Sequence, residues 1–259
     1  MRRGIVVGAV ALAGWAGACT KVGGDPNAVV ALSFDALPFP AIVIGDTLRD
    51  ETGVPVTLTA VALNPEGEVI PDAQITFLSL DPGVTVSPDG FLISNPGTAL
   101  SVRVVAEAGG LQSRPLALII TPAPDSMAQD GIVDTISYSL ANEAQNVSQA
   151  ITVKLFNTEV TPPIPATGWI VHFSLEYHGV PEASATSQRA WLVDEANRRS
   201  DVDTADAQGH ASRRLRIAPG ANPGLNDPDS IVVIATAAHR GLELRGAPVR
   251  IVVHIRARL

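Results

Sequence analysis

The residue types that most often perform catalysis do not form a catalytic pattern in this chain of 259 residues. Nucleophilic catalysis requires a Ser or Cys activated by a positioned base, but the sequence contains no Gly-x-Ser-x-Gly motif and only one Cys. None of the His residues belongs to a His-Glu-x-x-His zinc motif; they are His172, His178, His210, His239 and His254. The sequence therefore predicts no catalytic residue, no cofactor and a protein that is not an enzyme.

Two His residues and a carboxylate share one face of an expected strand at positions 168–179. His172, Glu176 and His178 are residue types that could bind a divalent metal. However, six residues of extended chain separate the two imidazoles by about 20 Å. We therefore favour a solvated outer face over a metal site.

An acidic segment further along the chain partly matches a calcium-binding loop. Asp201, Asp203 and Asp206 could supply carboxylate oxygens, but Ala205 occupies the place of a third ligand and Asp206 that of the glycine in such a loop. The favoured interpretation is a structural turn that ends at Gly209. Calcium binding by these three aspartates is the alternative, and no other metal site is predicted.

Positive charge is concentrated in one stretch of the chain. It could bind a sugar phosphate or an anionic glycan, whereas the alternative is charge on an edge strand that prevents sheets from aggregating. The net charge of −8 favours the second interpretation and argues against a nucleic-acid partner. The residues are Arg198, Arg199, Arg213, Arg214 and Arg216.

The N-terminus has the order of an export signal. Arg2 and Arg3 precede an apolar stretch at 4–15, and small residues at 16–18 lead directly to Cys19. The apolar stretch would rise only about 18 Å as a helix, too little to cross a hydrocarbon core of roughly 30 Å. The segment resembles the lipobox of bacterial lipoproteins, which implies cleavage after residue 18, lipidation of Cys19 and, with Thr20 next, sorting to the outer membrane. The alternative is an ordinary signal peptide with an unpaired Cys.

The rest of the chain reads as short strands separated by turns. Hydrophobic residues make up 46% of the sequence, and 22 Gly and 20 Pro favour turns over long helices. After a polar tether at 19–27, apolar residues alternate with polar ones in runs spaced as in a β-sandwich. Pro122–Asp125 interrupts the pattern and is expected to be an accessible break. We therefore predict one sandwich at 28–122 and a second at 123–259.

Both halves resemble bacterial immunoglobulin-like domains. Phe77–Gly110 resembles the group 2 type, with Val-x-Val, a Gly-led strand and a valine-rich strand that ends in Ala. Gly168–Leu175, Asp203–Leu215 and Asp229–Ala238 resemble the invasin-like group 1 type. The resemblance implies an all-β fold of two tandem immunoglobulin-like antiparallel β-sandwiches behind the lipoprotein signal peptide.

Together these features predict a non-enzymatic lipoprotein that is exported and anchored to the cell envelope. The lipid on Cys19 would be its contact with the membrane. Its role would be surface adhesion, interaction or spacing, and its ligand would be a protein or a glycan. One alternative is a periplasm-facing scaffolding or assembly component of the envelope. Another is an accessory subunit of an envelope enzyme complex.

Overall fold

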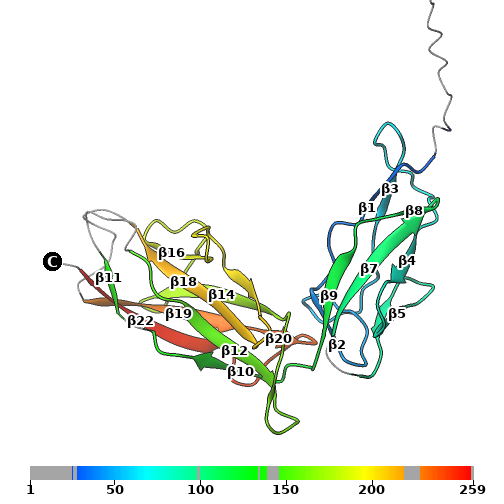
Figure 1. Cartoon of the computed structure of the whole chain (residues 1–259). Coiled ribbons are helices and arrows are strands. Elements are labelled where there is room, and N and C mark those ends of the chain that lie inside the picture. Colours follow the sequence, from blue (N-terminus) through cyan, green and yellow to red (C-terminus); the bar gives the residue numbers. More distant parts are fainter. Residues whose placement is uncertain are drawn as a thin grey trace, which may run out of the picture.

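The chain forms two β-sandwiches that meet at an angle (Figure 1). The computed structural model describes residues 25, 28–97, 100–133, 135–138, 146–218 and 228–257. Within these ranges every regular element is a strand, and no helix is long and apolar enough to cross a membrane. The signal segment and Cys19 lie outside the described residues.

The first sandwich contains nine strands from Ala31 to Thr121. One layer has the order β2-β9-β7-β4, with β2 parallel to β9 and the other pairs antiparallel, and β8 extends β7. The pairs β1-β3 and β5-β6 form the facing layer, where a bridge between Thr57 and Phe91 links them. The strands are β1 (Ala31–Ser33), β2 (Ala41–Val43), β3 (Val61–Leu63), β4 (Thr76–Ser79), β5 (Val84–Val86), β6 (Leu92–Ser94), β7 (Leu100–Ala108), β8 (Leu111–Gln112) and β9 (Leu116–Thr121).

The second sandwich is built from longer strands between Ser126 and Ala257. Its layers have the orders β10-β12-β18-β16 and β11-β22-β19-β14-β15, and β11 runs parallel to β22. The short strands β13 and β17 extend β12 and β14, while β20 and β21 form a separate hairpin. The strands are β10 (Ser126–Asp130), β11 (Ile136–Tyr138), β12 (Ile151–Asn157), β13 (Ile164–Pro165), β14 (Ile170–Tyr177), β15 (Val180–Glu182), β16 (Ala190–Val193), β17 (Val202–Thr204), β18 (His210–Ile217), β19 (Asp229–Thr236), β20 (Ala238–His239), β21 (Leu242–Glu243) and β22 (Val249–Ala257).

The strand order is that of an immunoglobulin-like fold. In such sandwiches the first, second, fifth and fourth strands form one sheet, and the third, sixth and seventh form the other. In the second sandwich β10, β12, β18 and β16 take the first set of places, and β14, β19 and β22 the second, with β15 as the additional strand beside the third. The first sandwich places β4, β7 and β9 in the same way. The all-β immunoglobulin-like prediction is therefore confirmed, whereas the group 1 and group 2 types stay predictions.

Alternation along the strands produces the core. In β14, Val171, Phe173 and Leu175 are buried between the layers while His172 and Ser174 are exposed. The same alternation holds along β12 and β19. Because side chains on a strand point alternately to opposite faces, this alternation makes the inward face of β14 apolar, while β12 and β19 each also bury one polar residue, Asn157 and Asp229.

Candidate functional site at the joint between the sandwiches

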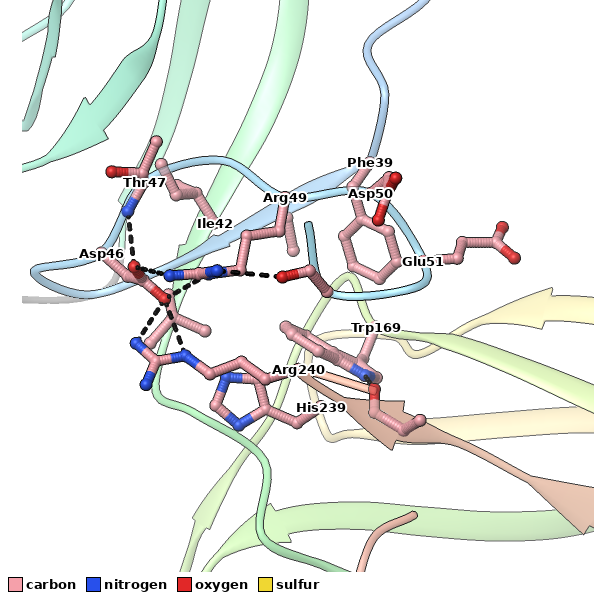
Figure 2. A pocket seen from close by; sticks show the side chains of 14 residues that line it. Phe39, Ile42, Asp46, Thr47, Arg49, Asp50, Glu51, Trp169, His239 and Arg240 are labelled. Carbon is pink, nitrogen blue, oxygen red and sulfur yellow. Dashed lines mark hydrogen bonds and ion pairs between the residues drawn. The ribbon is translucent and has the colours of Figure 1, made fainter. Parts of the chain in front are cut away.

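Aromatic, ionic and close backbone contacts come together where the sandwiches meet. The first sandwich contributes Phe39, β2 and the loop that follows β2, and the second contributes Trp169 and the turn between β20 and β21 (Figure 2). Residues far apart in the sequence therefore converge on one small region. Its contacts are apolar at the centre and ionic at one side.

Two aromatic rings form the apolar centre of this joint. Phe39 of the first sandwich and Trp169 of the second are both about 6% exposed, and their ring centroids lie 4.9 Å apart at 61°. The indole Nε1–H donates a hydrogen bond of 2.9 Å to the carbonyl of Ala238. Buried aromatic pairs in this tilted arrangement contribute about 0.5–1.5 kcal/mol beyond the burial of their area.

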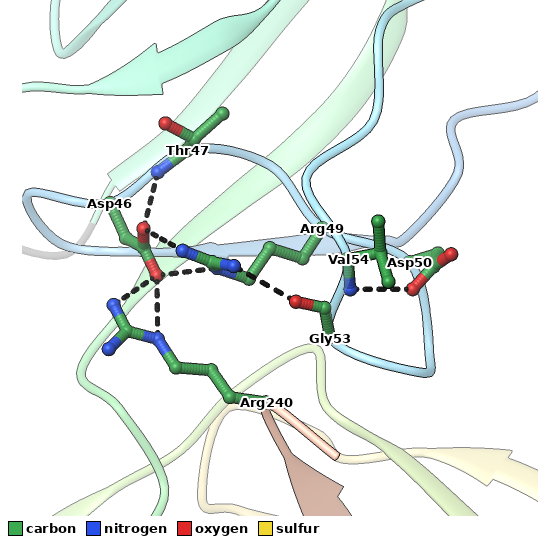
Figure 3. A network of polar contacts seen from close by, with 7 residues as sticks. All are labelled: Asp46, Thr47, Arg49, Asp50, Gly53, Val54 and Arg240. Atoms are coloured by element: carbon green, nitrogen blue, oxygen red, sulfur yellow. Dashed lines mark hydrogen bonds and ion pairs between the residues drawn. The ribbon is translucent and has the colours of Figure 1, made fainter.

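Asp46 forms the ionic part of the joint. Its carboxylate accepts hydrogen bonds from Arg49 in its own loop at 3.0 Å and from Arg240 of the other sandwich at 2.7 Å (Figure 3). Burial alone would raise the pKa of Asp46, but the hydrogen bonds from Arg49, Arg240 and the Thr47 N–H outweigh it. The pKa of this carboxyl therefore lies well below its usual range, and Asp46 is ionised throughout the physiological range.

The backbones of the two sandwiches also touch. Arg49 donates from Nη1 to the carbonyl of Gly53 at 2.9 Å, which holds this loop in place. A Cβ built on Gly53 would lie 2.4 Å from the Cα of Arg240. Only glycine can occupy this position without moving one sandwich away from the other.

His239 completes the lining of a cavity of about 20 Å³ at the joint, room for roughly one water molecule. Its ring stands edge-on to Trp169 with centroids 5.5 Å apart, and its buried Nε2 has no hydrogen-bond partner among the described residues. Burial lowers the pKa of His239, and the charges of Arg240 and Arg49 lower it further against the opposing effect of Asp46. The neutral imidazole is therefore favoured.

Hydrogen bonds and burial hold the predicted break between the domains in place, so the segment is less accessible than expected. Pro124 is buried, and the Asp125 carboxylate accepts hydrogen bonds from the N–H and Oγ1 of Thr158 at 2.9 and 2.7 Å. Asn157 donates from Nδ2 to the carbonyl of Ala123 at 2.8 Å. The proline content indicated an extended segment, but proline composition does not reveal that β12 and its following loop would cover it.

The predicted acidic segment forms a turn with its own hydrogen bonds. Asp206 Oδ1 accepts from the backbone N–H groups of Gln208 and His210 at 2.8 and 2.9 Å. Asp203 accepts from the N–H of Ser212 at 2.7 Å and pairs with Arg213 at 3.0 Å. In the described part of the chain, no three His, Cys, Asp or Glu side chains form a group that could hold a metal ion. Calcium binding by Asp201, Asp203 and Asp206 stays the alternative to the structural turn.

The arginine stretch does not lie on an edge strand, so that interpretation is wrong. β18 carries Arg213, Arg214 and Arg216 and lies between β12 and β16, hydrogen-bonded to both. Arg213 is 7% exposed and bonds Asp203 and Ser200 Oγ. A sequence without known strand pairing cannot distinguish a central strand from an edge strand.

The remaining arginines of this stretch already have partners inside the second sandwich. Arg198 pairs with Asp194 at 2.8 Å. Arg199 donates to the carbonyls of Ser184, Ala185 and Ser187, and its guanidinium lies 4.2 Å from the ring centroid of Trp191. These contacts use much of the donor capacity that an anionic glycan would require.

The His-rich face also differs from its prediction at one end. His172 is exposed on β14 as expected and lies 3.2 Å from Glu51 of the first sandwich. His178 does not continue that face, because β14 ends at Tyr177 and His178 has a φ of 49° in the following turn. Its ring stacks on Tyr177 with centroids 4.0 Å apart, and Nε2 lies 2.9 Å from Asp229.

Sequence reasoning did not identify the joint. Asp46 and Arg240 are 194 positions apart, so no local spacing connects them. Trp169 directly before a strand, and an Asp three residues before Arg49, are the signals that could have indicated a special loop. Neither signal indicates which distant segment the loop contacts.

No protein-family model matches the chain, and no curated protein sequence matches it. Among solved structures, it is similar to the Yersinia pseudotuberculosis adhesin InvE, with 13% identity over 90% of this chain and 61% of that one, at a TM-score of 0.36. It is also similar to the Escherichia coli adhesin FdeC, with 15% identity, 87% and 65% coverage and a TM-score of 0.32. A third similar structure is the D00-D0 domain of intimin, with 14% identity over 87% of this chain and 98% of that one, at a TM-score of 0.29.

The chain thus spans about 61% and 65% of the length of the first two of these proteins. At such identities and scores the likeness concerns fold alone. The class that the strand order itself defines is a tandem immunoglobulin-like β-sandwich protein.

Proposed function

We propose that this chain is a rigid two-sandwich module that is anchored to the cell envelope through Cys19. In this role it spaces or presents a surface for adhesion, and it performs no chemistry of its own. The joint is the observation that carries the proposal. Three contacts would resist bending between the sandwiches. They are the aromatic pair of Phe39 and Trp169, the ionic contacts of Asp46 with Arg49 and Arg240, and the close approach at Gly53.

Rigidity is useful to a spacer because a flexible tether lets the outer end return to the membrane. Domain interfaces within one chain usually permit relative motion unless they are apolar and well packed. This joint combines an aromatic pair with a buried carboxylate that binds one arginine from each side. The arrangement favours a spacing or presenting role over a hinge.

Distance measurements between one spin label on each sandwich test the rigidity. The full chain should give one narrow distance distribution. Phe39→Ala should broaden it, because the aromatic contact with Trp169 is lost. Phe34→Ala is the matched control, since Phe34 is equally buried but contacts Phe77 within the first sandwich. A broad distribution for the unmodified chain would contradict the spacer role.

Anchoring and orientation require measurements in cells. Cys19→Ser should move the protein from the membrane to soluble export fractions or leave it unprocessed. Degradation by protease added to intact cells would indicate outward display, as adhesion requires. Protection of the anchored protein would instead favour the periplasmic scaffolding alternative.

A further inference from the structure

β4 leaves one side of its backbone without a strand partner. It is the last strand in the order β2-β9-β7-β4 (Figure 1). Leu80 donates from its N–H to the carbonyl of Arg103 on the β7 side at 2.9 Å. Because antiparallel ladders alternate, Leu78 and Thr76 also face β7, whereas the N–H and C=O of Phe77 and Ser79 point away from it. In the described part of the chain, no strand pairs with those outward groups.

This edge also lacks the usual protection against pairing. Sheet edges are normally blocked by charged side chains, by proline or by a covering element. The seven residues of Gln74–Leu80 include no charged residue and no proline. In the second sandwich the corresponding strand β14 is covered by β15, which itself carries Pro181 and Glu182. The first sandwich therefore leaves the edge at β4 uncovered, whereas the second sandwich covers the corresponding strand β14.

Both faces of β4 present apolar side chains near that edge. On one face, Ile75 and Phe77 are half-buried and line a groove of about 360 Å³ beside Val86. On the other face, Leu78 and Leu80 are each 43% exposed. A strand added beside β4 would gain backbone hydrogen bonds and would cover apolar surface on both faces.

We propose that β4 pairs antiparallel with β4 of a second copy of this chain, centred on Phe77. Phe77 would then face Phe77 of the second copy, Ile75 would face Ser79, and Thr76 would face Leu78. In this register all the outward backbone groups of Phe77 and Ser79 find partners. Two identical faces that pair through a two-fold axis form a closed dimer, and the two sheets become one continuous sheet.

The charges around β4 agree with self-pairing. The acidic residues that flank β4 along the chain are Asp72 and Asp81, and in this register they would face Pro82 and Ala73 of the second copy. No two like charges are opposed, and Asp81 is already neutralised by Arg103 at 2.8 Å. Like charges placed directly opposite each other would have opposed the pairing.

Cysteine crosslinking tests the register. In full chains that carry Cys19→Ser, and therefore have no native cysteine, Thr76→Cys and Leu78→Cys are made separately. Thr76 and Leu78 would form a pair without hydrogen bonds, whose Cα separation of about 4.5 Å suits a disulfide. Mixing the two variants under mild oxidation should give a crosslinked dimer faster than either variant alone. Equal rates would overturn the register and with it the proposal.

Sedimentation over a concentration series tests the association. The chain should dimerise by about 100 μM, and Leu78→Lys should raise the dimer dissociation constant at least tenfold. Leu111→Lys, at a similarly exposed leucine of β8, is the matched control. Ser79→Pro removes an outward N–H without removing a hydrogen bond to β7, so it should also raise the dimer dissociation constant. This variant replaces Leu78→Lys in the test if Leu78→Lys fails to fold. A monomer at all concentrations, or a dimer that neither variant weakens, would overturn the proposal.

Discussion

At the scale of single residues, Asp46 connects the two sandwiches. Its side chain is 11% exposed and binds both Arg49 and Arg240. Asp46→Ala leaves both guanidinium groups without their carboxylate, so we expect a loss of about 1–3 kcal/mol in the free energy of unfolding. Arg240 is more than half exposed, so Arg240→Ala should lose only about 0.5–1 kcal/mol. Urea denaturation measures both.

The exposed Arg114, whose side chain has no described partner, provides the control for these substitutions. Arg114→Ala should leave the urea midpoint unchanged. If Asp46→Ala were as harmless as Arg114→Ala, the ionic contact at the joint would contribute nothing to stability.

His239 should make stability depend on pH. Its pKa in the folded protein is below the ordinary value of 6.5, so the unfolded chain binds more protons in the interval between the two values. Stability should therefore fall as pH decreases below about 6.5, until the lowered pKa of the folded protein is passed. His239→Gln should flatten the melting temperature between pH 7.5 and 5.5, whereas His254→Gln, at an exposed position of β22, should preserve the wild-type slope. A steeper slope in His239→Gln would contradict this assignment.

At the scale of elements, the turn before β18 depends on Gly209. Gly209 has a φ of 80°, and a Cβ there would lie 2.4 Å from the carbonyl oxygen of Leu155. Gly179 has a φ of 79° with no atom within 4 Å of its Cβ position. Gly179→Ala should therefore cost about 1 kcal/mol through backbone strain alone, and Gly209→Ala about 1–2 kcal/mol more.

Thermal unfolding compares the two glycine variants directly, with and without added Ca²⁺. Equal losses would show that β12 moves away at no cost. A rise in melting temperature with Ca²⁺ that Asp206→Ala abolishes would instead favour the calcium alternative at this turn.

The alternation of side chains made individual strands predictable. The alternation along positions 170–177 predicts that Val171, Phe173 and Leu175 share one face, and β14 buries all three. The same period of two puts Arg213 on the inward face of β18 with Ala211 and Leu215, although an apolar core offers a guanidinium no partner. Its partners, Asp203 and Ser200, come from a different segment, and which segment lies beside Arg213 cannot be derived from the alternation.

At the scale of the whole molecule, the joint was the least predictable feature. Its contacts connect loops whose lengths and flanking turns look ordinary in the sequence. Glu51 and His172 are 121 positions apart, and Asp46 and Arg240 are 194 apart. The proline-rich segment at 122–125 and the strand pattern that restarts after it predict a boundary between sandwiches, but they contain no information about whether the two sandwiches touch.

The connecting segment at 122–125 should accordingly resist proteolysis. Its carbonyls at Ala123 and Asp125 accept hydrogen bonds from Asn157 and the Arg245 N–H, and the Asp125 carboxylate holds Thr158. A protease binds its substrate as an extended backbone that is released from other contacts. The rate of cleavage at this segment therefore measures the fraction of molecules in which these hydrogen bonds are broken. With proteinase K and intact-mass analysis, the first cuts should fall outside this segment.

Asp125→Ala removes the contacts to Thr158 and should accelerate cleavage at this segment about tenfold. Asp72→Ala, in an exposed turn of the first sandwich, is the control and should not change that rate. Early cleavage at 122–125 in the unmodified chain would mean that the segment is as accessible as its proline content suggests. The contacts at the joint, which include Phe39 with Trp169, Asp46 with Arg240 and Glu51 with His172, would then hold the sandwiches together without the connecting segment.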